Sequence, residues 1–307
     1  MSGSILVGLD IGGTSVKAMA VSPGDPTGPA LAEVRHRTEP GREGIRDGIT
    51  TAVRALVEAV GPATDVAGIG VGIPGFVSRG AVSHAVNLGL GAEPLDLLPT
   101  LRGLTSGPVG VENDVKTAAL GARGWLARHD AGIDDYALLN VGTGLAAGMV
   151  LGGRLRAGAT GMAGEIGHLV FDRSGPVCPC GQTGCLELYA SGSGMRRSWS
   201  GTARQLFAAA EAGDASAVRT AADLTDGIAH AITLLAHAPD VALILVTGGM
   251  AARNPALRAA VSARLQHDDR TLVGRAVPVA PRVRWLPDDV AVGTRGAALL
   301  VAEEVRV

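Results

Sequence analysis

Residues 4–22 read SILVGLDIGGTSVKAMAVS, and this stretch decides what kind of fold the chain can form. Apolar and β-branched residues stand on both sides of a glycine pair, which predicts a strand, a tight turn and a second strand. Residues 136–155, YALLNVGTGLAAGMVLGGRL, repeat this design about one domain length further along the chain. Two similar sheet-based halves, each with a glycine turn at the end of a strand, would explain the repeat.

The segments around these two hairpins alternate between helical and strand-like patterns. Apolar residues recur at the 3.6-residue spacing of a helix in several segments: 43–60, 115–128, 203–237 and 288–305. A further helix is expected from Asn254, which precedes Pro255. Buried strands are expected at 66–75, 107–114 and 241–249. Strands alternating with helices predict an α/β protein.

Length and composition limit the classes of protein that the chain can belong to. Its 307 residues are enough for two domains, and 47% of them are hydrophobic. With 27 basic and 29 acidic side chains the formal net charge is −2, which argues against a general nucleic-acid binder. We find no targeting signal and no uninterrupted apolar stretch that would span a membrane. Three clustered cysteines do not suit a disulfide framework, so we expect a reducing, cytoplasmic setting.

The glycine turns are candidate phosphate-binding sites. The chain has no G-x-x-x-x-G-K-[ST] motif. Residues 70–75 match the dinucleotide-binding pattern G-x-G-x-x-G, but that pattern requires a helix to begin there, and Pro74 argues against one. Backbone N–H groups in a glycine turn can approach a phosphate closely, while Asp10 would repel a bare phosphate and therefore suits Mg²⁺. An ordinary hairpin turn remains the alternative for each turn taken alone. The predicted nucleotide and phosphate contacts are Asp10, Gly12, Gly13, Thr14, Lys17, Gly142, Thr143, Gly144, Gly248 and Gly249.

All three cysteines lie within eight positions, at Cys178, Cys180 and Cys185, with His168 shortly before them. Three thiolates and one imidazole form a closed, structural zinc site, which leaves no open position for a reacting water. Redox-active thiols, or a loop that carries cysteines without a function, are the alternatives. A loop cross-linked by zinc could hold the flanking Glu165 and Glu187 rigidly.

Taken together, three motifs resemble the ROK family of sugar kinases and repressors. They are Asp10-Ile-Gly-Gly-Thr14, Glu165-x-Gly-His168 and Cys178-x-Cys-Gly-x-x-Gly-Cys185-x-Glu187. The resemblance implies an actin-like, ribonuclease-H-like ATPase fold, with two α/β domains and a sugar bound in the cleft between them. The expected domains are 1–116, with the C-terminal helix 290–307 packed back on it, and 117–289, which carries the zinc loop.

The resemblance also implies roles for individual residues. Asp114 corresponds to the general base that takes the proton from the attacking sugar hydroxyl, a role that phosphoryl transfer requires. The positions that match sugar contacts are Gly75, Asn113, Asp114, Glu165, His168 and Glu187. His168 would bind zinc through one ring nitrogen and face the sugar with the other. Taken without the resemblance, Asp114 could instead be the N-cap of the helix expected at 115–128.

The resulting expectation is an ATP- and Mg²⁺-dependent kinase that converts glucose to glucose 6-phosphate. Kinases for N-acetylmannosamine, N-acetylglucosamine, mannose or fructose are the alternatives, as is a non-catalytic sugar sensor. A repressor would carry a DNA-binding segment first, whereas Asp10 follows only nine residues. The second turn continues with Ala146 and Ala147, where similar kinases carry glycines. The resemblance implies a homodimer or a higher homo-oligomer, with sugar and ATP as partners.

Overall fold

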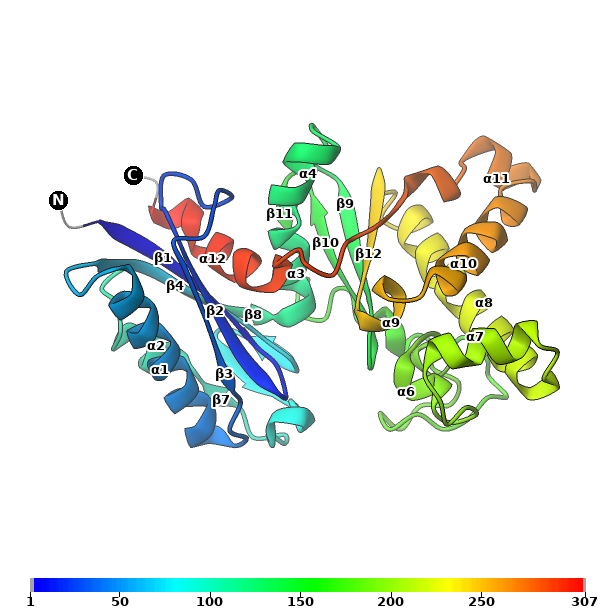
Figure 1. Cartoon of the computed structure of the whole chain (residues 1–307), viewed down its shortest axis with the longest axis horizontal. Helices are drawn as coiled ribbons and strands as arrows, with labels where there is room; N and C mark the ends of the chain where they lie inside the picture. Colours follow the sequence, from blue (N-terminus) through cyan, green and yellow to red (C-terminus); the bar gives the residue numbers. More distant parts are fainter. Residues whose placement is uncertain (1–2, 306–307) are drawn as a thin grey trace. The chain divides into compact units, whose positions relative to one another are not determined.

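The structure is a computed structural model that describes residues 3–305, apart from the side chains of residues 303 and 304. The chain divides into two compact units (Figure 1). The first comprises Met1–Gly132, Leu155–Ala163 and Ala291–Val307, and the second comprises Ile133–Arg154 and Gly164–Val290. No helix within residues 3–305 is both long and apolar enough to cross a membrane.

In its described part, the first unit is built on a five-stranded sheet of order β3-β2-β1-β4-β8. Its strands are β1 (Ser4–Ile11), β2 (Ser15–Val21), β3 (Ala32–Arg37), β4 (Asp65–Ile73) and β8 (Val109–Asn113). A small sheet adds β5 (Phe76–Ser78), β6 (Ala81–Ser83) and β7 (Leu95–Asp96). The helices are α1 (Arg42–Val60), the 3₁₀ helix η1 (Val86–Leu88), α2 (Leu98–Arg102), α3 (Asp114–Gly121), α4 (Arg123–His129) and α12 (Val292–Val305).

The alternation of side chains along β1 explains how helices cover both faces of this sheet. Ile5 and Val7 belong to one apolar cluster with Ile45 of α1, whereas Leu6 belongs to another with Val301 of α12. Figure 1 shows α1 and α12 on opposite faces of the sheet. Gly8 lets α12 come close, since a Cβ there would collide with backbone atoms of the helix.

The second unit repeats the strand pattern of the first, with sheet order β11-β10-β9-β12-β13 in the described residues. Its strands are β9 (Tyr136–Val141), β10 (Leu145–Leu151), β11 (Arg154–Leu155), β12 (Leu243–Thr247) and β13 (Val283–Trp285). The hairpins β1–β2 and β9–β10 are antiparallel, and each first strand also pairs in parallel with a later strand, β4 or β12. The internal repeat expected from the sequence is therefore confirmed.

The remaining helices of the second unit lie around its sheet and its loops. They are η2 (Ile166–His168), α5 (Glu187–Ala190), α6 (Gly192–Met195), α7 (Ala203–Glu211), α8 (Ala215–His237), α9 (Gly249–Ala252), α10 (Pro255–Asp268), α11 (Leu272–Ala276) and η3 (Ala280–Arg282). The helix expected over 203–237 is two helices, because Gly213 has φ of +88° and Asp214 caps α8. The helix expected over 115–128 is also divided, into α3 and α4 at Ala122.

The first unit extends to Gly132, beyond the residue 116 at which the sequence placed the domain limit. Helix α3 packs closely along α12 within this unit, and two glycines make the contact possible. A Cβ at Gly121 would collide with the carbonyl of Val292, and one at Gly296 with the carbonyl of Thr117. This packing holds residues 117–129 with the first sheet.

Candidate functional site

The first glycine turn joins β1 to β2 and places a carboxylate next to a cation. Gly12 N–H donates to the carbonyl of Ser15 at 3.0 Å, and the Thr38 hydroxyl donates to the carbonyl of Gly12 at 2.6 Å. Asp10 and Lys17 face each other in the ladder, with Oδ2 and Nζ 3.8 Å apart. Burial raises the pKa of Asp10 above its ordinary value, and Lys17 partly offsets this effect. A partly buried carboxylate that is stabilised by a nearby cation suits a magnesium ligand.

Two residues that sequence reasoning did not select lie against this turn. Asn87 limits the space at Gly13, where a Cβ would be 3.2 Å from the Cβ and carbonyl oxygen of Asn87. Gly293 approaches the carboxyl group of Asp10, because a Cβ at Gly293 would be 2.8 Å from Oδ2. Both contacts join segments far apart in the sequence, so no local pattern could indicate them.

Asp114 begins helix α3, and the N-cap of that helix is its neighbour Asn113. Asn113 Oδ1 accepts hydrogen bonds from the backbone N–H groups of Val115 (3.0 Å) and Lys116 (3.3 Å). Its Nδ2 donates to the carbonyl of Gly75 at 3.3 Å. The structure thus brings Gly75, Asn113 and Asp114 together in the first unit. The N-cap alternative for Asp114 is not supported, since Asn113 performs that role.

Glu165, His168 and Glu187 lie in the second unit. Glu165 precedes η2, and its carbonyl accepts from the backbone N–H of His168 at 3.2 Å. Glu187 begins α5, and its Oε2 accepts from the backbone N–H of Leu145 at 3.0 Å. This bond ties Glu187 to the strand that follows the second glycine turn. Gly144 leaves the necessary space, because a Cβ there would be 2.6 Å from Glu187 Oε2.

The cysteine loop gathers four metal-binding side chains. One ligand atom from each of His168, Cys178, Cys180 and Cys185 lies within 4.8 Å of the others. The Sγ atoms of Cys180 and Cys185 are 3.6 Å apart, and sulfurs about 2.3 Å from a tetrahedral zinc lie about 3.8 Å apart. Nδ1 of His168 is buried and has no hydrogen-bond partner among the described residues. The donor set and its spacing therefore fit zinc.

The thiols of this loop influence each other's ionisation. Burial and the neighbouring thiols raise the pKa of Cys185 to about 12. Burial also opposes ionisation of Cys180, but hydrogen bonds from Gln182 and from the neighbouring thiols lower its pKa to about 6. Three thiolates so close together would repel one another, so a cation is needed for all three to ionise.

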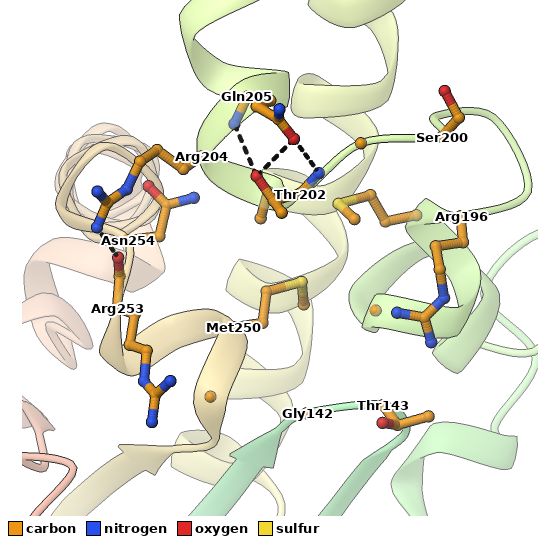
Figure 2. A pocket seen from close by; sticks show the side chains of 15 residues that line it. Gly142, Thr143, Arg196, Ser200, Thr202, Arg204, Gln205, Met250, Arg253 and Asn254 are labelled. Carbon is orange, nitrogen blue, oxygen red and sulfur yellow. Dashed lines mark hydrogen bonds between the residues drawn. The ribbon is translucent and has the colours of Figure 1, made fainter.

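A pocket of about 880 Å³ opens beside the second glycine turn (Figure 2). Of the glycine-turn residues chosen from the sequence, Gly142, Thr143 and Gly249 line it. Sequence reasoning missed the other side chains of its wall, which come from α6, α7, α9 and the segments beside them. The missed residues are Gly192, Met195, Arg196, Ser200, Gly201, Thr202, Ala203, Arg204, Gln205, Met250, Arg253 and Asn254. The only local signals among them are helix caps, T-x-x-Q at Thr202 and N-P at Asn254.

Comparison with known proteins identifies the family. The sequence profile of the ROK family matches residues 6–304, and the chain belongs to this family. A glucokinase of Halalkalibacterium halodurans is 32% identical over 330 residues, with 99% of this chain and 97% of that protein covered. An N-acetylmannosamine kinase of Citrobacter koseri is 32% identical over 292 residues, covering 88% of this chain and 96% of that protein.

Solved structures agree with the sequence comparison. A ROK hexokinase from Thermus thermophilus has a TM-score of 0.80 and 29% identity, covering 98% of this chain and 99% of that one. A ROK family glucokinase from Streptomyces griseus, in complex with glucose and AMPPNP, has a TM-score of 0.75 and 30% identity, covering 97% and 99% of the two chains. The expected α/β, actin-like ATPase fold is confirmed.

Proposed function

We propose that this protein is an ATP-dependent sugar kinase that phosphorylates a hexose hydroxyl, with glucose as the preferred acceptor and glucose 6-phosphate as the product. The observation that carries the proposal is similarity to a glucokinase over 99% of the chain, together with Asp114 at the start of a helix that Asn113 caps. The N-acetylmannosamine kinase relative favours that amino sugar as the second candidate acceptor.

In the proposed reaction, a carboxylate oxygen of Asp114 takes the proton from the sugar hydroxyl. The resulting oxygen nucleophile forms a bond to the γ-phosphorus of MgATP while the bond from that phosphorus to the β–γ bridging oxygen breaks, and ADP leaves. Asp10 would hold the magnesium ion that arrives with ATP, which would neutralise charge on the phosphate oxygens. The two glycine turns bind phosphate oxygens through backbone N–H groups and the hydroxyls of Thr14 and Thr143.

Lys17 has a supporting role in this proposal, since its ammonium group faces Asp10 in the strand ladder. Gly248 lies after β12, against the end of β9 that leads into the second turn. A Cβ at Gly248 would be 2.4 Å from the carbonyl oxygen of Val141, too close for any side chain, and φ of Gly248 is +103°.

Glu165, His168 and Glu187 are the proposed sugar contacts of the second unit. A structural zinc held by His168 and the three cysteines would make the loop rigid, and it has no part in the chemical step. Its role is to keep His168 and Glu187 in a fixed orientation, since both lie in or beside the cysteine loop. We place the reaction in the reducing cytoplasm because zinc-binding thiols must remain reduced. A homodimer or higher homo-oligomer is expected from the family resemblance alone.

A coupled assay of ADP release tests the function. The purified enzyme is given MgATP and about ten hexoses and amino sugars in turn, with N-acetylmannosamine among them. Glucose is expected to give the highest kcat/KM. If no sugar releases ADP although calorimetry shows sugar binding, the protein is a sensor and not a kinase. A parallel series with inorganic polyphosphate in place of ATP tests the donor.

A further inference from the structure

Two amide side chains, Gln205 and Asn254, line the pocket of Figure 2. The oxygen of each accepts hydrogen bonds from the protein itself, so its nitrogen is the atom left to bind a ligand. Gln205 Oε1 accepts from the backbone N–H of Thr202 at 2.8 Å and from its hydroxyl at 2.9 Å. Thr202 Oγ1 accepts in return from the backbone N–H of Gln205 at 3.2 Å. Because these bonds identify the amide oxygen of Gln205, its nitrogen Nε2 is the group available to a bound molecule.

Asn254 is arranged in the same way and is more deeply buried. Its side chain caps helix α10, with Oδ1 accepting from the backbone N–H of Leu257 at 3.2 Å. Only 3% of the residue is exposed, and Nδ2 is buried with no hydrogen-bond partner among the described residues. In Figure 2 this nitrogen points toward the side of the pocket that Thr202 and Gln205 line. A buried donor without a partner is unfavourable, so an acceptor atom that reached it would be held.

The charged side chains of the pocket wall are cations. Arg196, Arg204 and Arg253 line it, and the described lining residues include no Asp or Glu. Arg204 donates to the carbonyl of Arg253 at 3.3 Å, and Arg253 pairs with Asp288 outside the wall at 2.6 Å. Guanidinium groups donate hydrogen bonds and accept none.

Two hydroxyl groups complete the polar side chains of the wall. Thr143 belongs to the glycine turn, and the hydroxyl of Ser200 points away from the middle of the pocket in Figure 2. Thr143 lies across the pocket from Gln205 in Figure 2, and the third hydroxyl of the wall, that of Thr202, already bonds to Gln205. The side chains near Asn254 and Gln205 therefore offer donors.

We propose that this pocket recognises its phosphoryl donor through acceptor atoms alone, namely phosphate oxygens and the purine edge of N7 and the 6-substituent, with Asn254 as the specificity-determining residue. The 6-amino group of adenine then contributes nothing to binding, and a 6-oxo purine triphosphate serves at least as well as ATP. This inference rests on the proposed kinase function and defines the class of donor that the same site accepts.

The chemistry of the purines gives the reason. Adenine presents the acceptor N7 next to a donating amino group, whereas a 6-oxo purine presents N7 next to the acceptor O6. Side-chain donors can bond to both N7 and O6 of a 6-oxo purine. Of the adenine edge they can bond only to N7. Sites that discriminate strongly against an analogue do so by leaving a polar group unpaired.

Steady-state kinetics with ATP and ITP as donors and the best sugar as acceptor test the proposal. For the wild-type protein the kcat/KM of ITP is expected to equal or exceed that of ATP. A preference for ATP greater than about tenfold overturns the inference, while sugar phosphorylation by ATP leaves the proposed function intact. If neither donor phosphorylates any sugar, both the function and the inference fail.

Two variants assign the effect to the pocket. Asn254→Asp keeps an acceptor for the helix cap and replaces the free donor by an acceptor, so the ratio of kcat/KM for ITP to that for ATP is expected to fall about fivefold. Gln205→Glu preserves the capping box and is expected to lower the same ratio. The added charge affects both triphosphates alike and cancels in the ratio.

Gln266→Glu, an exposed amide-to-acid change on α10 outside the pocket wall, is the matched control and is expected to leave the ratio unchanged. Thermal unfolding checks that each variant is folded. An unchanged ratio in both Asn254→Asp and Gln205→Glu overturns the assignment to these side chains.

Discussion

The two glycine turns share a strand–turn–strand design but differ in charge. The first turn has Asp10 at the end of its strand, paired with Lys17 across the hairpin. The corresponding residue before the second turn is Asn140, which pairs with Ala146. The nearby carboxylate there belongs to Glu187, and the backbone N–H of Leu145 donates to it.

This difference shows how one local design serves two roles. A turn whose strand ends in a carboxylate can hold a cation but repels a bare phosphate, whereas a turn whose strand ends in an amide can donate backbone N–H groups to an anion. The pocket of Figure 2 opens at the second turn, where its arginines add positive charge. The first unit therefore carries the proposed catalytic base Asp114 and the proposed magnesium ligand Asp10, and the second carries the arginine-lined pocket.

The largest expected effect comes from Asp114→Asn, which removes a carboxylate that nothing in the proposed mechanism replaces. We expect kcat to fall about 10³-fold while the sugar still binds, because a general base acts in the chemical step. Stopped assays of sugar phosphate and calorimetry with sugar measure the two quantities. The matched variant in the second unit, Glu165→Gln, should mainly raise the KM for sugar. Equal losses of kcat in both variants would contradict the division of roles.

The next largest effect is expected from Asp10→Asn, which makes the first turn resemble the second. The kcat/KM for MgATP should fall about 100-fold, since the magnesium ligand is lost. Moving the carboxylate to the other turn, in Asp10→Asn combined with Asn140→Asp, should not restore activity. Recovery of activity in the double variant would show that the two turns are interchangeable.

The same Asp10→Asn variant should be more stable than the wild type near neutral pH. Burial raises the pKa of Asp10 in the folded state, so the ionised carboxyl group destabilises the fold at any pH above that raised value. The gain in Tm should therefore be present at pH 7 and disappear below the ordinary value of 3.8, where both states hold the proton. Thermal unfolding across this pH range measures it, and a lower Tm at pH 7 would contradict the assignment.

Cys185→Ser should have an intermediate effect, confined to the second unit. We expect the zinc content to fall from about one per chain toward zero and the KM for sugar to rise about tenfold, because the loop loses its cross-link. Elemental analysis of protein purified without a metal column measures the zinc. Val177→Ala changes an exposed, non-ligand residue of the same loop and should retain the metal. If the zinc-free protein kept an unchanged KM for sugar, the cysteine loop would have no influence on sugar binding.

The smallest effect is expected from Ala147→Gly beside the second turn. Ala147 is 2% exposed and belongs to the apolar core of its unit, so its methyl group does not face a phosphate. The KM for MgATP should change less than about twofold, and the free energy of unfolding should fall about 1 kcal/mol. Urea unfolding and kinetics measure these values. The matched Ala18→Gly in β2 should lose similar stability, whereas a clear fall in KM for Ala147→Gly would show that the methyl group obstructs the nucleotide.

Much of the site could be predicted from local spacing. The cysteine cluster and the two glycine turns are short motifs whose residues must lie close together because the chain between them is short. The alternative interpretation of Asp114 as the N-cap of α3 was one residue too late, because the cap is Asn113. Asn and Asp are equally good caps, so the sequence could not choose between the two neighbours. The wall of the pocket was missed because Arg196, Gln205 and Asn254 lie in or next to three different helices, far apart in the sequence.

By itself, the sequence determined the family, the α/β class, the repeated hairpin and the four candidate zinc ligands, because each depends on residue identity at short separation. Only the tertiary structure decided which polar groups remain available after the fold has used their partners. Asn254 shows the difference: its oxygen is occupied by a helix N–H and its nitrogen by nothing among the described residues. Hydrogen bonds form between atoms that the fold brings together, often from distant parts of the chain. They therefore cannot be derived from the order of the residues alone.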